Sequence, residues 1–536
     1  MEVSDLTNKK LQIGLIVDSN SLDRWQFDAV ANCRDLVEIN TIIYCQNNQS
    51  KKKILKHGLY YFLNLLSIRN KQTTQITWAS LTNASCQIIK FNCNQSGNWQ
   101  TIDETTKAKL AEKNLDIIVK FGMNLLRDPN TLRAKFGVLS FHHGDPTAFR
   151  GRPAGFYELK QDANEVGAVV QELSNQLDAG KMRAFGRYQI SAHSYRKTLE
   201  ALYVNSAFLL RQAILNCVDD KSLNIAPTGK NYRLPSNYAV VQFAMLLIIR
   251  KIKRLTFGLF LRRKWQIAET APLSLTNQKP TTEVKLLKTL LTPRGLGFIA
   301  DPFVLPNGKV ICEATPKNSQ RGFLMALNNG ENSQIDTSIL GKKHLSFPFV
   351  VKHAGQLLVM PEMAENGSQV ICELSDSFEI TKVHSLQGLE NERLIDPVLF
   401  FRESKWWLFA GKSGNESDHL FLWSSENIFG PYVAHRMNPV VVDPSRARNA
   451  GGFLNINNEI FRLGQDNRRD YGDGITVCRV TQLSDTAYDE TPVTRLTIAG
   501  QKGPHTLSTN GINTYIDFYN KGFDPLAWFA RLKTKF

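Results

Sequence analysis

An apolar strand that runs into two adjacent histidines is the part of this sequence best suited to chemistry. Residues 137–142 read GVLSFH, and His143 follows, with a polar loop that closes at Arg150. Open α/β sheets place their reactive side chains at the ends of strands. Asp178 lies on a later turn, and a histidine and a carboxylate that meet from two loops can move a proton. We therefore predict catalytic roles for His142 and Asp178.

The elements that must position these side chains alternate between strand-like and helix-like patterns. Residues 12–17 (QIGLIV) and 115–119 (LDIIV) are short apolar runs suited to buried parallel strands. Residues 163–177 and 196–217 carry helical spacing. The alternation predicts an α/β domain over residues 1–230.

From residue 263 to the end, short strands follow one another at regular intervals, separated by turns such as Asn307-Gly308. Asp-Pro pairs recur at the starts of strands, with Asp301 and Asp396 in equivalent places. A repeat of roughly 50 residues of this kind is typical of a β-propeller. We therefore expect an all-β, five-bladed propeller over residues 263–536, within a multidomain protein.

Three propeller carboxylates, Asp301, Glu362 and Asp396, come from successive repeats and are expected to face one end of the central channel. A pair of carboxylates about 5 to 10 Å apart meets the geometric demand of glycoside cleavage. Alternatively, the Asp-Pro aspartates hydrogen-bond backbone amides at strand starts and fix the geometry of the blades. A further set of polar residues predicts a rim suited to phosphorylated or acidic sugars, namely Arg446, Arg448 and Asp466.

A basic amphipathic connector is expected over residues 231–262. Phe243–Ile249 is continuously apolar, basic residues follow it, and no acid occurs between Tyr238 and Lys264. The apolar runs are too short to span a bilayer. Such a segment can lie on an anionic membrane surface, or it can be an interdomain helix that buries its apolar side chains.

The remaining composition narrows the class of protein. The net charge of +16 comes without a recognised nucleic-acid-binding motif, so no nucleic-acid partner is expected. The eight cysteines form no CxxC pair and no metal-ligand spacing, which predicts reduced thiols and no bound metal. The polar start of the chain lacks the pattern of a secretory signal. We expect a cytoplasmic protein, with peripheral contact to the inner face of the membrane if the connector binds lipid.

The stretch Ser140–Gly151 resembles the core motif of the formyltransferase family, Asn-x-His-Pro-Ser followed by a short loop to Arg-Gly. Asp178–Gly180 resembles the family's later Asp-x-Gly loop. The resemblance covers roughly residues 10–215 and implies a Rossmann-like fold, 10-formyltetrahydrofolate as formyl donor and a primary amine as acceptor. It implies that His142 is the general base and Asp178 its partner, and it assigns donor binding to Phe121, Gly122, Met123, Arg150 and Gly151.

One residue departs from the family motif. Ser140 stands where the family has the asparagine that polarises the formyl carbonyl, so it joins the expected catalytic set. A serine hydroxyl donates one hydrogen bond, but it is shorter and would have to shift or use a water.

The second part resembles the five-bladed propeller at the N-terminus of glucosamine inositolphosphorylceramide transferases, itself similar to the propellers of glycoside hydrolase families 32 and 43. The matching stretches are residues 300–303, 347–350, 360–362, 395–397, 406–409, 445–452, 464–466 and 471–472.

Together the two resemblances imply an N-formyltransferase that acts on an amino sugar or glycoconjugate amine, with a propeller that recognises or processes the glycan. The alternative is a glycan-processing or glycosyl-transferring propeller protein whose formyltransferase-like domain is degenerate and only binds, and Ser140 favours it. A third class is a non-catalytic scaffold at the membrane surface.

Overall fold

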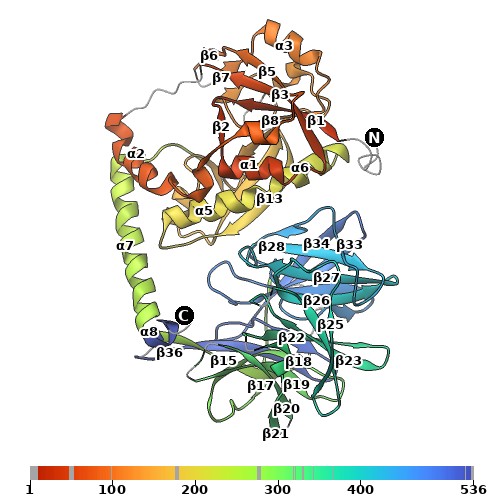
Figure 1. Ribbon diagram of the computed structural model, residues 1–536. Helices are drawn as coiled ribbons and strands as arrows, with labels where there is room; N and C mark the ends of the chain where they lie inside the picture. Colours follow the sequence, from red (N-terminus) through yellow and green to blue (C-terminus); the bar gives the residue numbers. More distant parts are fainter. Residues whose placement is uncertain are drawn as a thin grey trace. The chain divides into compact units, whose positions relative to one another are not determined.

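The chain divides into two compact units, residues 1–251 and 252–536 (Figure 1). The computed structural model describes residues 10–47, 54–97, 99–175, 180–273, 279–317, 319, 321–328, 331–341, 343–365, 367–525 and 527–532. The boundary falls inside helix α7 (Asn237–Phe260), which begins in the first unit and ends in the second. The segment expected as a connector is therefore largely one continuous helix.

A seven-stranded sheet forms the centre of the first unit, in the order β13-β12-β10-β8-β1-β3-β5. The strands from β10 to β5 are parallel to their neighbours, whereas β12 and β13 are antiparallel. The strands are β1 (Leu11–Val17), β3 (Val37–Cys45), β5 (Gln87–Phe91), β8 (Ile117–Lys120), β10 (Val138–His142), β12 (Glu165–Glu172) and β13 (Lys181–Gln189).

Helices and small strand pairs surround this sheet. The helices are α1 (Arg24–Ala31), α2 (Ile54–Ile68), α3 (Glu104–Ala111), α4 (Phe156–Lys160), α5 (Tyr195–Ser206) and α6 (Leu209–Val218). The short strands are β2 (Ser21–Asp23), β4 (Gln75–Thr77), β6 (Asn94–Ser96), β7 (Trp99–Thr101), β9 (Leu125–Leu126), β11 (Phe149–Gly151) and β14 (Lys230–Tyr232). Within the described part of the chain, one helical stretch, Tyr195–Val218, is long and apolar enough to cross a membrane, and 56% of its window is buried inside the protein.

The helix expected over residues 163–177 is wrong, because strand β12 occupies this part of the chain. Val166–Val170 is fully buried, and β12 pairs with both β10 and β13. A buried place between two strands favours a valine-rich segment as strand, whatever its local spacing. The helical spacing over 196–217 corresponds to α5 and α6, which are separate helices.

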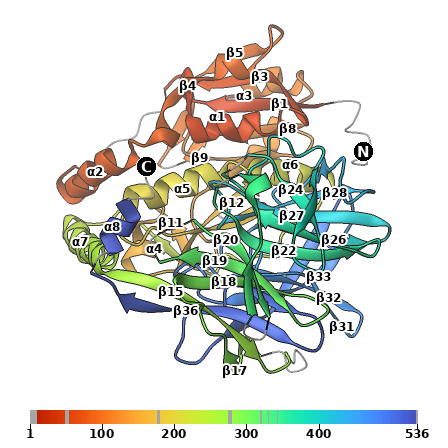
Figure 2. The same ribbon diagram turned by 60° about the horizontal axis from the view of Figure 1, so that its bottom comes forward.

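Five antiparallel sheets make up most of the second unit (Figure 2). One joins β17 (Leu286–Thr289), β15 (Leu261–Thr270), β36 (Thr514–Phe523) and β35 (Leu507–Thr509). Two more contain β18 (Leu296–Val304), β19 (Val310–Pro316), β20 (Phe323–Asn328) and β21 (Glu331–Gln334), and then β22 (Ser346–His353), β23 (Gln356–Glu362), β24 (Val370–Leu374) and β25 (Ile380–Ser385).

The last two sheets complete this unit. One contains β26 (Leu394–Arg402), β27 (Lys405–Lys412), β28 (His419–Ser425) and β29 (Val433–Ala434), with β30 (Val441–Val442) beside β28. The other contains β31 (Leu454–Ile456), β32 (Glu459–Gln465), β33 (Ile475–Leu483) and β34 (Tyr488–Thr497), with β16 (Thr281–Glu283) parallel to β34. Helix α8 (Ala527–Leu532) follows β36.

The first and last long strands of this unit lie in one sheet. β15 follows directly after α7, and all ten of its residues pair with β36, from Leu261 opposite Phe523 to Thr270 opposite Thr514. Both views show the two strands side by side (Figure 1, Figure 2). This pairing closes the series of sheets with strands from both ends of the unit.

Three of the sheets begin with the same backbone irregularity. In β18, β22 and β26 the register shifts at the residue before a proline. Those residues, Asp301, Phe347 and Asp396, have φ of 50°, 42° and 46°. Non-glycine residues in this region cost about 1 to 3 kcal/mol each and persist where surrounding contacts hold them. The Asp-Pro repeat in the sequence therefore corresponds to a repeated bulge.

Gly451 lies where two backbone segments of these sheets come very close together. Its φ is +130°, and an added Cβ would lie 2.0 Å from the Leu507 carbonyl oxygen. Gly414 also has positive φ (+100°), but its Cβ would meet open space. We expect Gly451→Ala to lower the free energy of unfolding by at least about 2 kcal/mol more than Gly414→Ala, because only the first adds a backbone clash to the torsional strain. Urea unfolding measures both, and equal losses would contradict the close approach.

Candidate functional site

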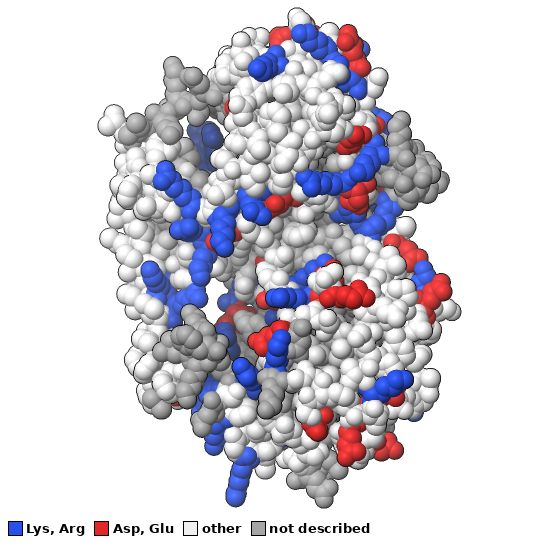
Figure 3. Space-filling model, viewed as in Figure 1, with Lys and Arg blue, Asp and Glu red and all other residues white. Residues whose placement is uncertain are grey.

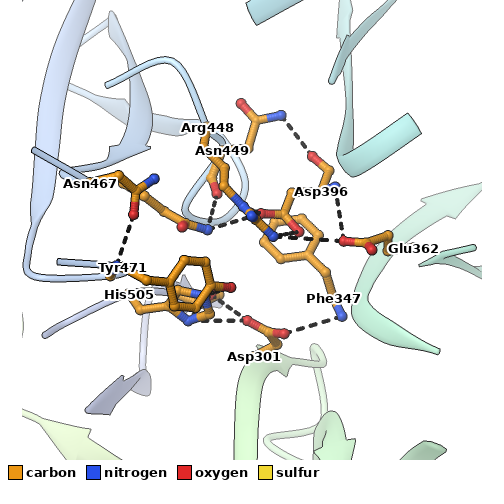
Figure 4. Close-up of polar contacts among 12 residues, drawn as sticks. Asp301, Phe347, Glu362, Asp396, Arg448, Asn449, Asn467, Tyr471 and His505 are labelled. Atoms are coloured by element: carbon orange, nitrogen blue, oxygen red, sulfur yellow. Dashed lines mark hydrogen bonds and ion pairs between the residues drawn. The ribbon is translucent and has the colours of Figure 1, made fainter. Parts of the chain in front are cut away.

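Carboxylates of the second unit bind the backbone amides of the bulges in the next sheet. The Asp517 carboxylate accepts from the Asp301 N–H at 2.9 Å, and the Asp301 carboxylate accepts from the Phe347 N–H at 3.3 Å. In the same way, Glu362 accepts from the Asp396 N–H at 3.4 Å. Figure 4 shows the side chains of Asp301, Glu362 and Asp396 gathered in one region. The three carboxylates predicted from the sequence thus come together, and their contacts with backbone amides are those of the structural alternative.

The environment of each carboxylate is buried and polar. Asp301 accepts from the Thr506 hydroxyl at 2.7 Å, and its Oδ1 lies 3.4 Å from His505 Nδ1. Burial raises the pKa of Asp301 to about 6, while the nearby His505 acts in the opposite direction. Burial, together with the neighbouring Asp396, raises the pKa of Glu362 well above its ordinary value. The surroundings of Glu362 thus disfavour its charged form.

Asp396 is held in an ion pair. Its Oδ2 accepts from Arg448 Nε at 2.6 Å and from the Gln465 side chain at 2.9 Å. Arg448 also lies 3.9 Å from Glu362, and its guanidinium stacks 5.0 Å from the centre of the Tyr471 ring. Through these contacts the charge of Asp396 is paired with groups inside the protein.

A cavity of this unit lies beside the three carboxylates Asp301, Glu362 and Asp396. It has a volume of about 320 Å³ and is lined by basic, aromatic and titratable side chains, and these three carboxylates are not among them. Its lining residues are Arg262, Arg263, Trp265, Phe298, Ala300, Glu313, His344, Tyr471, His505, Ala527 and Arg531. We take this cavity as the candidate functional site.

Glu313 is a lining residue that sequence reasoning missed. It pairs with Ala300, directly before the bulge in β18, as Glu362 pairs with Ser346 before the bulge in β22. The two glutamates are therefore equivalent in successive sheets, and the repeat itself contained the signal. Burial and the neighbouring Asp301 raise the pKa of Glu313 well above its ordinary value, which disfavours a negative charge on this carboxyl.

His505 supplies a buried positive charge at the cavity. Its Nδ1 lies 2.8 Å from Asp517 Oδ2 and its Nε2 lies 2.8 Å from the Tyr471 hydroxyl. Although burial opposes the charge, Asp517 and Asp301 raise the pKa of His505 to about 9. Protonated His505 donates from both nitrogens, so the Tyr471 oxygen accepts and its own O–H can donate to a ligand.

Cations gather at one side of the cavity around the ring of Phe257 in the last turn of α7. The charged groups of Arg263, Lys521 and Arg531 lie 5.4, 5.3 and 5.3 Å from the centre of that ring. Asp470 pairs with both Arg263 and Lys521. Burial and the charges of Arg263 and Arg262 lower the pKa of Arg531, as mutual repulsion among cations requires.

A group with metal-ligand geometry adjoins the cavity. Ligand atoms of Asp301, His505 and Asp517 lie within 4.8 Å of one another, and all three residues are buried. Asp517 already accepts from the N–H groups of Asp301, His505 and Thr506. A metal would need His505 without its Nδ1 proton, whereas the raised pKa of His505 retains that proton. The group is thus better suited to hydrogen bonding than to metal binding.

Two of the three residues expected to be catalytic in the first unit lie on one strand. Ser140 and His142 lie at the end of β10, whereas Asp178 lies outside the described residues. Phe121 and Gly122 line a second cavity of about 170 Å³, together with Asp18, Ser19, Asp23 and other residues near the end of β1. Met123 is buried with φ of 66°.

The other residues expected at that site have structural contacts. Arg150 donates to the Pro227 carbonyl at 2.9 Å, and Gly151 approaches Tyr232 so closely that a Cβ would lie 2.1 Å from its carbonyl oxygen. His143 packs against Trp25 and Tyr203, with ring centres 4.9 and 5.0 Å apart. Burial lowers the pKa of His143 to about 3, so its ring is neutral.

The residues expected as a basic rim lie inside ion-pair networks instead. Arg446 pairs with Asp443 and Glu490, and Arg448 pairs with Asp396. Asp466 binds Arg468 and Arg495, which lower its pKa despite burial. Side-chain exposure of these three residues is 22%, 12% and 4%, so the expectation of a solvent-facing rim is corrected. The cations at the cavity are different residues, and they come from β15 and α8.

Comparisons with known proteins match the second unit. Residues 294–517 match the family model described as glucosamine inositolphosphorylceramide transferase 1, N-terminal. The protein of that name from Arabidopsis thaliana is 26% identical over 254 residues, which cover 44% of this chain and 32% of the relative. The one from Oryza sativa subsp. japonica is 27% identical over 213 residues, which cover 37% and 28%. The matched region thus spans about a third of the length of these relatives.

Solved structures give more distant likenesses. An exo-β-1,3-galactanase from Clostridium thermocellum matches with a TM-score of 0.31 and 11% identity, covering 39% of this chain and 52% of that one. A glycinamide ribonucleotide transformylase from Symbiobacterium toebii matches with a TM-score of 0.28 and 15% identity, covering 42% and 95%.

These findings correct the expectation that the protein is a formyltransferase. The family model and the curated relatives are named as glucosamine inositolphosphorylceramide transferases, which transfer a different group. Within the first unit, Arg150 and Gly151 have structural contacts, whereas the catalytic roles expected of Ser140, His142 and Asp178 stay predictions. The motif-length match at residues 140–151 reflected spacing, which does not fix chemistry.

The charge of His505 predicts a pH dependence of stability. The folded pKa of about 9 exceeds the ordinary 6.5, so the stabilisation is complete below pH 6.5 and is lost as pH rises through 9. We expect the difference in unfolding free energy between the wild type and His505→Gln to shrink by up to about 3 kcal/mol across this window, at about 1.4 kcal/mol per pH unit. Urea unfolding at several pH values measures it. Tyr471→Phe keeps the His505–Asp517 pair and should retain the wild-type slope; a flat wild-type profile would refute the assignment.

Proposed function

We propose that the second unit is a five-bladed propeller that binds the phosphate-bearing headgroup of a glycoconjugate in the cavity beside α7, and that the protein acts in glycosyl transfer or processing of that glycoconjugate. The observation that carries the proposal is the sign of the charge on the residues that line the cavity. Arg262, Arg263, Arg531 and protonated His505 line it, while burial disfavours a negative charge on its carboxyl, Glu313. Such a site favours an anion.

The shape and chemistry of the lining fit a phosphorylated sugar or polyol. Trp265, Phe298 and Tyr471 supply aromatic surface, and Glu313, His344 and the Tyr471 hydroxyl supply donors and acceptors. His344 Nδ1 accepts from the Gly322 N–H at 2.8 Å, which leaves the proton of its neutral ring on Nε2. Hydroxyl groups of a sugar can pair with such groups, while the arginines bind phosphate.

The names of the relatives agree with this chemistry. They are transferases of glucosamine to inositolphosphorylceramide, a lipid whose headgroup contains a phosphoryl group and a polyol. The family-model match covers residues 294–517, which contribute Phe298, Ala300, Glu313, His344, Tyr471 and His505 to the cavity. A headgroup of that class is the ligand we propose for this site.

Glycoside cleavage by Asp301, Glu362 and Asp396 has less support. Each is buried, each contacts backbone or a cation of the neighbouring sheets, and the cavity lining does not include them. A general base must reach the proton that it removes. We assign these carboxylates to the assembly of the second unit, and we assign the first unit a binding role in place of group transfer.

Removal of one cavity arginine should weaken binding of the headgroup. Arg262 donates to the carbonyls of Lys317 and Ser319 at 3.1 and 3.4 Å, so its guanidinium can turn to a phosphate with little structural loss. We expect Arg262→Gln to raise the Kd of inositol 1-phosphate about 10- to 100-fold, the value of one charge-assisted hydrogen bond. Calorimetric titration measures this.

The control for that experiment is Arg294→Gln, which removes an exposed arginine outside the cavity. It should leave the Kd unchanged. The unphosphorylated polyol should bind wild type and Arg262→Gln alike. Equal binding of inositol 1-phosphate by wild type and Arg262→Gln would refute the proposed phosphate site.

Glu313→Gln tests the charge of the cavity. Burial and the neighbouring Asp301 raise the pKa of Glu313, which favours the neutral carboxyl that glutamine resembles. We expect the Kd for inositol 1-phosphate to change by less than about threefold. If Glu313 were ionised, its removal would relieve repulsion and tighten binding about tenfold or more. Such tightening would contradict the assigned protonation state.

A further inference from the structure

Helix α7 presents a continuous apolar stripe to solvent. Its exposed members are Tyr238, Val241, Met245, Ile248, Ile252, Leu255 and Leu259, spaced alternately three and four residues apart. Residues with this spacing lie on one face of a helix. The opposite face holds the buried Val240 and Phe243. The helix is thus packed on one side and apolar on the other.

Helix α2 adds a second apolar face in the first unit. Leu55, Leu59, Phe62, Leu65 and Leu66 are all exposed, and Leu55 is 99% exposed. The Asn237 side chain at the start of α7 accepts from the Leu59 N–H at 3.0 Å and donates to the Leu55 carbonyl at 3.1 Å. His57 Nδ1 lies 2.8 Å from the Pro235 carbonyl oxygen. These contacts bring α2 next to the beginning of α7.

Helices α2 and α7 themselves carry no acidic residue. The sequence has no Asp or Glu from residue 39 to 102 or from residue 221 to 268, the stretches that contain α2 and α7. Lys251 and Lys253 are exposed on either side of the apolar stripe. Figure 3 shows Lys and Arg atoms on the otherwise white surface where Figure 1 draws α7. An occupant of this face must therefore be apolar inside and anionic at its surface.

We propose that the α2–α7 face docks the protein on the surface of an anionic lipid bilayer. The apolar stripe enters the boundary between headgroups and acyl chains, and the lysines bind acidic headgroups. The helix lies in the plane of the membrane, because its charged residues and its packed face prevent it from crossing. This inference goes beyond the proposed function and does not depend on it.

A second copy of the chain fits this face less well. The three–four spacing is that of a coiled-coil seam, but such seams are flanked by residues of both charges. Here the flanking charges are all positive, so two copies aligned in parallel would bring like charges together. Charge complementarity therefore favours the bilayer.

The docking face ends at the mouth of the headgroup cavity. Arg531, which lines the cavity, donates to the carbonyls of Phe257, Gly258 and Leu261 at the end of α7. Trp528 and Phe529 of α8 and Phe523 of β36 are exposed large apolar residues of the same unit. A lipid headgroup could thus reach the cationic mouth while its chains stay beside apolar side chains.

The test is co-sedimentation of the full chain with vesicles of phosphatidylcholine, with or without phosphatidylserine. We expect binding to the anionic vesicles that weakens steeply as salt rises, and at least tenfold weaker binding to phosphatidylcholine alone. Ile252→Glu, which puts a charge in the stripe, should weaken binding about thirtyfold. The double variant Lys251→Glu and Lys253→Glu should weaken it by at least about thirtyfold.

Matched controls distinguish binding through this face from nonspecific binding to vesicles. Ile512→Glu changes another exposed isoleucine, and Lys285→Glu with Lys288→Glu reverses two exposed lysines elsewhere. These variants should bind vesicles like the wild type, and every variant should bind inositol 1-phosphate as the wild type does. Equal binding to neutral vesicles, equal losses in the controls, or a dimer that Ile252→Glu dissociates in place of vesicle binding would overturn the proposal.

Discussion

The second unit depends on carboxylates that each satisfy a backbone amide of the neighbouring sheet. The bulge residues Asp301, Phe347 and Asp396 adopt a backbone conformation that side chains disfavour, and their N–H groups point away from their own sheet ladders. Asp517, Asp301 and Glu362 accept from those N–H groups. A buried amide without a partner costs about as much as a lost hydrogen bond. Sheets that share such contacts form only as a set.

The same contacts decide what the buried acids can do. Glu362 and Glu313 lie where charge is disfavoured, and Asp396 is neutralised by Arg448. His505 gains a charge because Asp517 and Asp301 flank it. A region rich in acidic residues in the sequence therefore presents a positive potential to its cavity. The sign of a site follows from burial and partners more than from the count of acids.

Much of the second unit could be predicted from the sequence, because its repeats place Asp-Pro, apolar strands and turns at regular distances. That regularity identified Asp301, Glu362 and Asp396 as neighbours, and the structure brings them together. The cavity could not be predicted in the same way. Arg262, Arg263 and Arg531 lie outside the repeats, and pairing of β15 with β36 brings them to the site. Long-range pairing of this kind leaves no local pattern.

In the first unit, local sequence patterns predicted some elements correctly and others wrongly. Short apolar runs predicted β1 and β8, but helical spacing over 163–177 was misleading, because β12 is buried between two strands and its valines suit that place. The match to a formyltransferase motif failed for a related reason. Motif length records where a loop begins and ends, whereas chemistry depends on which side chains remain accessible there. His143, the neighbour of the predicted base His142, is enclosed by aromatic rings, and a comparison of motif lengths does not register such surroundings.

The pairing of β15 with β36 also affects how the chain folds during its synthesis on the ribosome. Residues 261–267 have β36 as their strand partner, and the other partner of β15, β17, reaches residues 268–270 alone. During synthesis this edge stays unpaired until more than two hundred further residues have been added. Unpaired strand edges can pair with other chains. Arg262, Arg263 and Lys264 lie on it. Consecutive like charges discourage such pairing, so the residues that later line the cavity would also protect the nascent chain from aggregation.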